Sequence, residues 1–114
     1  YLVVYPTSSI VGSVVGAARS AELATYALFE EGIDPSSILS VTASAPVPPV
    51  AEDEEGAIAR TNDSVAYGGS AHVITDTDHE PPSIASTASE KYGEPFADAF
   101  ADVSWQTDIP AEVL

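Results

Sequence analysis

Apolar and polar positions along the chain alternate with periods that distinguish strands from helices. The β-branched and aromatic run at residues 1–6 predicts an initial strand that stops at its proline. Between residues 10 and 31 apolar side chains recur at spacings of three and four, which predicts one long helix with Gly32 just beyond its end. Residues 38–45 and 71–75 predict two more strands. A strand, a crossover helix and a second strand in this order favour a parallel βαβ unit.

The rest of the chain consists of short segments separated by turns. Two apolar segments at 57–60 and 64–67 flank a turn-like stretch and favour short strands. Residues 84–92 and 95–102 predict two shorter helices, the second because apolar aromatic residues recur there four positions apart. Residues 103–107 favour a strand at the edge of the sheet.

Together these elements predict a single small α/β or α+β domain over residues 1–114. We expect a sheet of about four to five strands, with the long helix and one or two shorter helices packed on it. Three prolines and an acidic run predict an exposed loop at residues 46–56. Residues 108–114 are expected to form an extended C-terminal tail.

Charge changes this picture more than any other compositional feature. Eighteen acidic residues face three basic ones, which gives a formal net charge of −15. Like charges at this density repel one another and oppose compaction, whereas molar salt screens that repulsion. A composition so poor in lysine is typical of proteins from halophiles that accumulate salt, so we expect a halophilic source. K⁺ or Na⁺ would then associate with the surface without specific sites.

Several classes of partner and chemistry are excluded by composition. Three scattered cations cannot form the basic patch that nucleic acid or an anionic membrane surface requires. The absence of cysteine excludes disulfides, zinc–thiolate centres and iron–sulfur clusters. No apolar run approaches the roughly 20 residues that span a bilayer, and no signal segment is visible. We therefore expect a soluble protein of a halophile's cytoplasm or of a virion.

The loop after the first predicted strand is one candidate binding site. Ser8, Ser9 and Gly12 precede or begin a helix, the place where α/β proteins bind phosphate or nucleotides. The loop lacks the lysine of a P-loop, and its glycines do not match the dinucleotide-binding spacing. The alternative is that these glycines allow the helix to pack closely.

A second candidate follows the strand that ends at residue 75. Asp76, Asp78, His79 and Glu80 could gather around a divalent cation such as Ca²⁺ or Mg²⁺ if the chain turned there. Strand geometry separates His72 from these groups. The alternative is a solvated turn that holds no specific ion, and apart from this candidate we expect no cofactor.

Nothing in the sequence identifies a catalytic residue. No GxSxG motif is present, and the one acid inside an apolar helical run, Glu22, is expected to face solvent. Amphipathic or apolar side chains that could form an interface with another subunit include Tyr67, Trp105, Ile109, Val113 and Leu114.

These observations favour a non-enzymatic structural subunit of a larger assembly, formed with copies of itself or with other proteins. One specific version is a virion component of a haloarchaeal virus, such as a head–tail connector or tail protein. The alternative is a small enzyme or ligand-binding domain that uses the Ser8–Gly12 loop or the Asp76–Glu80 cluster.

Overall fold

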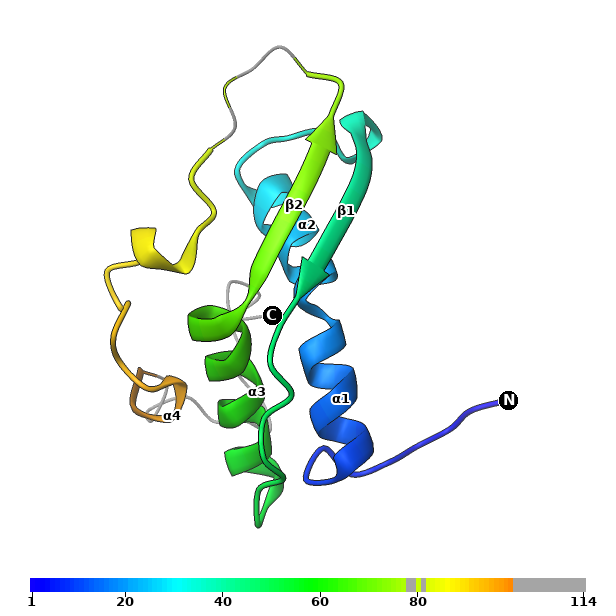
Figure 1. Ribbon diagram of the computed structural model, residues 1–114, viewed down its shortest axis with the longest axis vertical. Helices are drawn as coiled ribbons and strands as arrows, with labels where there is room; N and C mark the ends of the chain where they lie inside the picture. The colour runs from blue at the N-terminus through cyan, green and yellow to red at the C-terminus, as the bar shows by residue number, and fades with distance from the viewer. Residues whose placement is uncertain (78–79, 81, 100–114) are drawn as a thin grey trace.

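The computed structural model describes residues 1–77, 80 and 82–99. Helices and two strands follow one another along the chain in the order shown in Figure 1. They are α1 (Ile10–Ala18), α2 (Ser20–Glu30), the 3₁₀ turn η1 (Pro35–Ser37), β1 (Ile38–Ser44), α3 (Glu54–Gly68), β2 (Ser70–Thr75), the 3₁₀ turn η2 (Ser86–Ala88) and α4 (Phe96–Ala99).

The fold class is α+β, with helices packed on an antiparallel sheet, as predicted at that level. β1 and β2 form the sheet of the described residues and pair antiparallel, with Val41 opposite Val73. Both strands were predicted within a residue or two. Within the described part of the chain, the sheet has two antiparallel strands in place of the expected four to five strands and parallel βαβ unit. The chain continues past β1, reverses, and returns through α3 directly into β2, so the two strands run in opposite directions (Figure 1).

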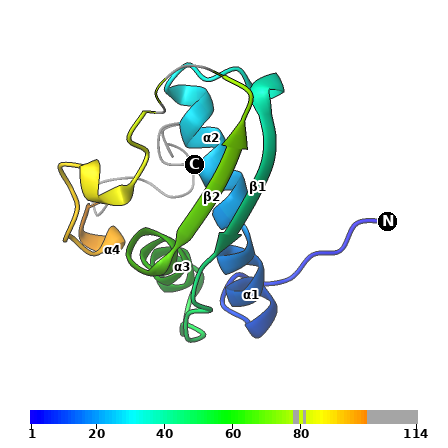
Figure 2. The same cartoon turned by 45° about the horizontal axis from the view of Figure 1, so that its top comes forward.

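The predicted first strand is wrong, because residues 1–6 form no strand in the structure. They extend away from the body of the molecule in both views (Figures 1 and 2). A strand needs a neighbour for its backbone hydrogen bonds, and no described segment provides one here.

The predicted long helix is two helices separated at Arg19. The Arg19 backbone (φ −72°, ψ −5°) lies between α1 and α2, and its N–H is shared between the carbonyls of Val15 and Gly16. α2 covers one face of the sheet, whereas α1 packs beside α3 (Figure 2). The predicted end at Gly32 is confirmed. Gly32 has a φ of +88°, and the N–H groups of Gly32 and Ile33 close a Schellman ending on Phe29 and Leu28.

The largest error of prediction concerns α3, which replaces the short strands expected at 57–60 and 64–67. Asp53 caps this helix, because its side chain accepts a hydrogen bond from the Gly56 N–H at 2.7 Å. The acidic run that suggested a loop therefore supplies the helix cap and the first turn, where negative charge is favourable. Arg60 and Ser64 then donate hydrogen bonds to carbonyls of the preceding Pro-rich segment, at Val50 and Pro46, and hold it on α3.

The shorter helices differ from expectation. Residues 84–92 contain only the 3₁₀ turn η2 and further turns, so the helix predicted there is wrong. α4 begins close to the predicted position, and its first N–H, at Phe96, is bound by the Asp63 carboxylate at 2.8 Å. The predicted edge strand at 103–107 and the tail at 108–114 lie outside the described residues. No helix in the described part of the chain is long and apolar enough to cross a membrane.

The buried core is built almost entirely from small side chains. The buried apolar residues are Ala17, Leu28, Ala51, Ala57 and Ala59. No large side chain among the described residues is fully removed from solvent. The elements therefore approach closely through small residues, and most large apolar side chains remain at the surface.

Candidate functional site

A cavity of about 620 Å³ lies between α2, α3, the start of β2 and the segment at 84–92. Its walls are mainly apolar, with Leu23 and Ala27 from α2 and Val65 from α3. Hydroxyl groups of Ser20 and Ser70 add polar points on the same wall. No acidic or basic side chain occurs among the described residues that line it. The cavity could bind a flat, mainly apolar ring, and the titratable side chains in its lining are the phenols of Tyr67 and Tyr92.

One wall is held in place by Tyr67, an expected interface residue. Its ring lies 5.3 Å from that of Tyr92, centroid to centroid, at an angle of 49°. Its hydroxyl donates a hydrogen bond to the Glu94 carbonyl and accepts one from the Gly93 N–H at 3.1 Å. Ser86 also bonds to the Ala66 carbonyl. These contacts tie the irregular segment after β2 to α3 and so form the side of the cavity.

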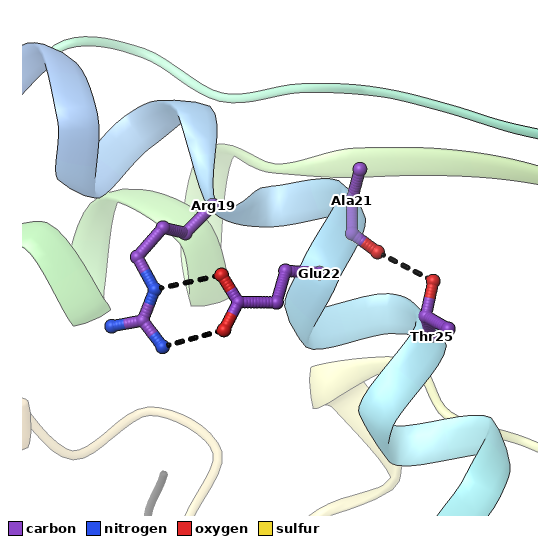
Figure 3. Close-up of polar contacts among 4 residues, drawn as sticks. All are labelled: Arg19, Ala21, Glu22 and Thr25. Atoms are coloured by element: carbon purple, nitrogen blue, oxygen red, sulfur yellow. Dashed lines mark hydrogen bonds and ion pairs between the residues drawn. The ribbon is translucent and has the colours of Figure 1, made fainter.

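Arg19 and Glu22, at the start of α2, form an ion pair (Figure 3). Arg19 Nε and Nη2 each lie 3.1 Å from a different oxygen of the Glu22 carboxylate, a two-point contact that fixes both groups. Ser20, next to Arg19, lines the cavity, and Leu23 lies one turn further along the face that carries Arg19. Arg19 and Glu22 do not themselves line the cavity, but each precedes a lining residue in the sequence, Ser20 and Leu23 respectively.

The electrostatic effect of the pair is to keep Glu22 ionised. Hydrogen bonds from Arg19, followed by its positive charge, hold the pKa of Glu22 below the ordinary value of 4.5. Both side chains are well exposed, so Glu22 faces solvent as the sequence predicted. The sequence signal for this pair is its i, i+3 spacing, which makes the two side chains neighbours on a helix surface.

The predicted phosphate loop is already satisfied by groups of the chain itself. Ser9 caps α1, accepting from the Gly12 N–H at 3.0 Å while donating to the Pro6 carbonyl at 2.6 Å. The backbone N–H and hydroxyl of Ser8 bind the carboxylate of Glu54. A Cβ on Gly12 would lie 2.1 Å from the Thr7 carbonyl oxygen, so this glycine permits a close approach of backbone to backbone.

The predicted metal cluster is only partly described. Asp76 follows β2, and its N–H donates to the Ser37 carbonyl at 3.0 Å. Glu80 is exposed, whereas Asp78 and His79 lie outside the described residues. Within the described residues no three acidic or histidine side chains come together as a metal site would require. A divalent site formed by the full set stays a prediction.

The remaining interface candidates, Trp105, Ile109, Val113 and Leu114, also lie outside the described residues. Their part in an assembly stays a prediction.

Comparison with known proteins decides the family. Residues 1–113 match the family described as cyclohydrolase (MCH). The chain belongs to the cyclohydrolase family. It is 43% identical over 106 residues to the methenyltetrahydromethanopterin cyclohydrolase of Halobacterium salinarum, covering 92% of this chain and 34% of that protein. The enzymes of the same name from Methanocella arvoryzae (41% identical; 90% and 33% covered) and Methanosphaerula palustris (39%; 98% and 39%) are also similar.

Membership of the cyclohydrolase family corrects the function expected from the sequence. A non-enzymatic assembly subunit or virion component is wrong, because the family and its named members are metabolic enzymes. The Halobacterium relatives give the expected halophilic source only weak support, since members from other genera match as well. The chain spans about a third of the length of the cyclohydrolases that it matches.

Proposed function

We propose that this chain forms part of the active site of a methenyltetrahydromethanopterin cyclohydrolase. The observation that carries the proposal is the family match over residues 1–113, together with 43% identity to a relative of that name. The name specifies a hydrolysis that opens the ring closed by a methenyl group.

Elementary chemistry states what such a site must do. A methenyl carbon between two nitrogens shares their positive charge, so the substrate is an amidinium-type cation. Water adds to that carbon, one of the two C–N bonds breaks, a formyl group remains on the other nitrogen, and one proton is released overall. A carboxylate near the carbon would stabilise the cation and accept a hydrogen bond from the attacking water.

The Arg19–Glu22 pair and the adjoining cavity match these needs. The apolar cavity accommodates a flat ring, and its hydroxyl groups can hydrogen-bond to the ring's polar edge. Glu22 remains ionised through its contact with Arg19 and carries negative charge beside the cavity. Arg19 orients the carboxylate, because two parallel hydrogen bonds leave it a single geometry. Other residues of a complete cyclohydrolase would enclose the substrate.

The test uses a chimera, because this chain spans only part of its relatives. The chain replaces the matched segment of the Halobacterium salinarum enzyme, and hydrolysis is followed by the ultraviolet absorbance of the methenyl-pterin. We expect turnover by the chimera and a loss of about 10²-fold or more in kcat for Glu22→Gln. Glu30→Gln, at the other end of α2, is the matched control and should keep kcat within about threefold, well short of that catalytic effect. A folded chimera without turnover, or equal effects of the two variants, would contradict the proposal.

A further inference from the structure

Helix α1 buries its small residues and leaves its large apolar residues exposed. Its buried side carries small residues, since Gly12, Ser13 and Ala17 are buried and Gly16 is half-buried. A Cβ on Gly16 would lie 2.5 Å from the Thr61 Cγ2, so only glycine allows the two helices this approach. The large apolar residues of α1 are the ones left exposed.

The segment that precedes the helix is also apolar and exposed. Ile10 is 74% exposed, Val11 51% and Val14 47%, and Val15 is also exposed. Leu2, Val3 and Val4 are exposed to 80% or more. We call Ile10, Val11, Val14 and Val15 of α1 the N-terminal apolar surface, which the exposed segment Tyr1–Val4 precedes in the chain. A helix that faced water would instead carry polar residues on this side.

Charge separates this surface from the rest of the protein. The chain has a net charge of −15, yet residues 1–18 contain no charged side chain, the first being Arg19. Self-association and aggregation are opposed elsewhere by dense negative charge, but nothing opposes apolar contact here. Exposed apolar patches of this kind mark interaction sites.

We propose that the N-terminal apolar surface is where this chain docks on the remaining two-thirds of a cyclohydrolase, carried on the same or a separate polypeptide. This rests on the proposed function, because it assumes that the chain works within a complete cyclohydrolase. The relatives are about three times as long as the segment that they share with this chain. The rest of such a protein is the partner that we propose. The packing of α1 through its small residues is a second reason, because the large apolar side chains that this helix leaves exposed in the isolated chain would be buried by that partner.

The test compares the same substitutions in the isolated chain and in the chimera with the Halobacterium salinarum enzyme. The double variant Val11→Ser/Val14→Ser removes apolar area from the surface, and Phe29→Ser, at 51% exposure on α2, is the control. Valine, phenylalanine and serine have similar helix propensities, so both should change the melting temperature of the isolated chain little. In the chimera we expect the double variant to lower it by about 3 °C or more and the control to have little effect.

Each outcome decides the proposal without reference to turnover. Equal small shifts in the isolated chain and the chimera would overturn it. Sedimentation of the isolated chain as a dimer that Val14→Asp dissociates, with no effect of that variant in the chimera, would assign the surface to a second copy and would also overturn it. If the chimera does not fold, serines at the aligned positions of the intact Methanocella arvoryzae enzyme give the same comparison. Loss of turnover in Glu22→Gln alters none of these readouts.

Discussion

The carboxylate of Glu54, in the first turn of α3, accepts hydrogen bonds from the backbone N–H and from the hydroxyl of Ser8, just ahead of α1. The same carboxylate accepts from the Thr7 N–H at 2.7 Å. Residues 46 positions apart are thereby joined, and the starts of two helices are fixed side by side. The donors belong to the loop that the sequence suggested for phosphate, and phosphate binding there stays a prediction.

Removing this carboxylate should loosen the contact between α1 and α3. We expect Glu54→Ala to lower the melting temperature more than Glu54→Gln, because the amide retains one hydrogen-bond acceptor for Thr7 or Ser8. Glu55→Gln is the control, since Glu55 shares the first turn and its helix-dipole effect. Thermal unfolding followed by circular dichroism measures all three. Equal shifts for residues 54 and 55 would mean that the contact adds nothing.

Low pH should remove the stabilisation that the Glu54 carboxylate provides. Hydrogen bonds from Ser8, its hydroxyl first, and from Thr7 lower the pKa of Glu54 below 4.5 in the folded chain. A depressed folded pKa gives stability that is complete above the unfolded value and is lost as pH falls through the folded value. The difference in melting temperature between wild type and Glu54→Gln should therefore be constant near neutral pH and shrink below about pH 4.5. A difference independent of pH in that range would contradict it.

The two glycines of α1 should respond differently to alanine. At Gly16 the added methyl meets the Thr61 side chain, and overpacking of about 1–3 kcal/mol is partly offset by about 1 kcal/mol of helix propensity. At Gly12 it meets the Thr7 backbone, which cannot rotate away. We expect Gly12→Ala to destabilise more in urea unfolding. Thr61→Ser should rescue Gly16→Ala and leave Gly12→Ala unchanged.

Salt should stabilise the chain because its net charge is −15. The screening length falls from about 10 Å at 0.1 M salt to about 3 Å at 1 M, which suppresses repulsion among the carboxylates. We expect the melting temperature to rise over this range of KCl. Glu31→Gln, at the negative end of the α2 dipole, should stabilise at low salt and lose that advantage at high salt. If Glu31→Gln still raises the melting temperature in molar salt, the cause is not the charge of Glu31 at the end of the helix.

Local chemistry made some elements predictable. Gly32 ends α2 because a left-handed residue is needed there, and Ser9 caps α1 because its hydroxyl reaches the Gly12 N–H. The two observed strands are short runs rich in β-branched residues and bounded by turns, a local pattern that predicts strands. α3 was missed because its small and polar residues show little apolar periodicity. Its stability comes from the Asp53 cap and from contacts with α1.

In the candidate site, too, local features were predictable from the sequence and long-range contacts were not. Glu22 was recognisable as an acid within an apolar helical run, and its exposure followed from the helical pattern. Its partnership with Arg19 is a local i, i+3 contact, whereas the cavity depends on Tyr67 holding the segment after β2 against α3. The Tyr67 contact joins residues far apart in the sequence and leaves no local pattern.

By itself, the sequence determined the fold class, the two strands, the helix ending at Gly32, and the charge that makes salt relevant. These depend on the conformational preferences of single residues and their near neighbours. Tertiary structure alone decided that α1 turns its small face inward, that the strands run antiparallel, and that Glu54 fills the loop expected to bind phosphate. Each is a competition between packing partners, and the closest fit of small residues, rather than the largest apolar face, determined the arrangement.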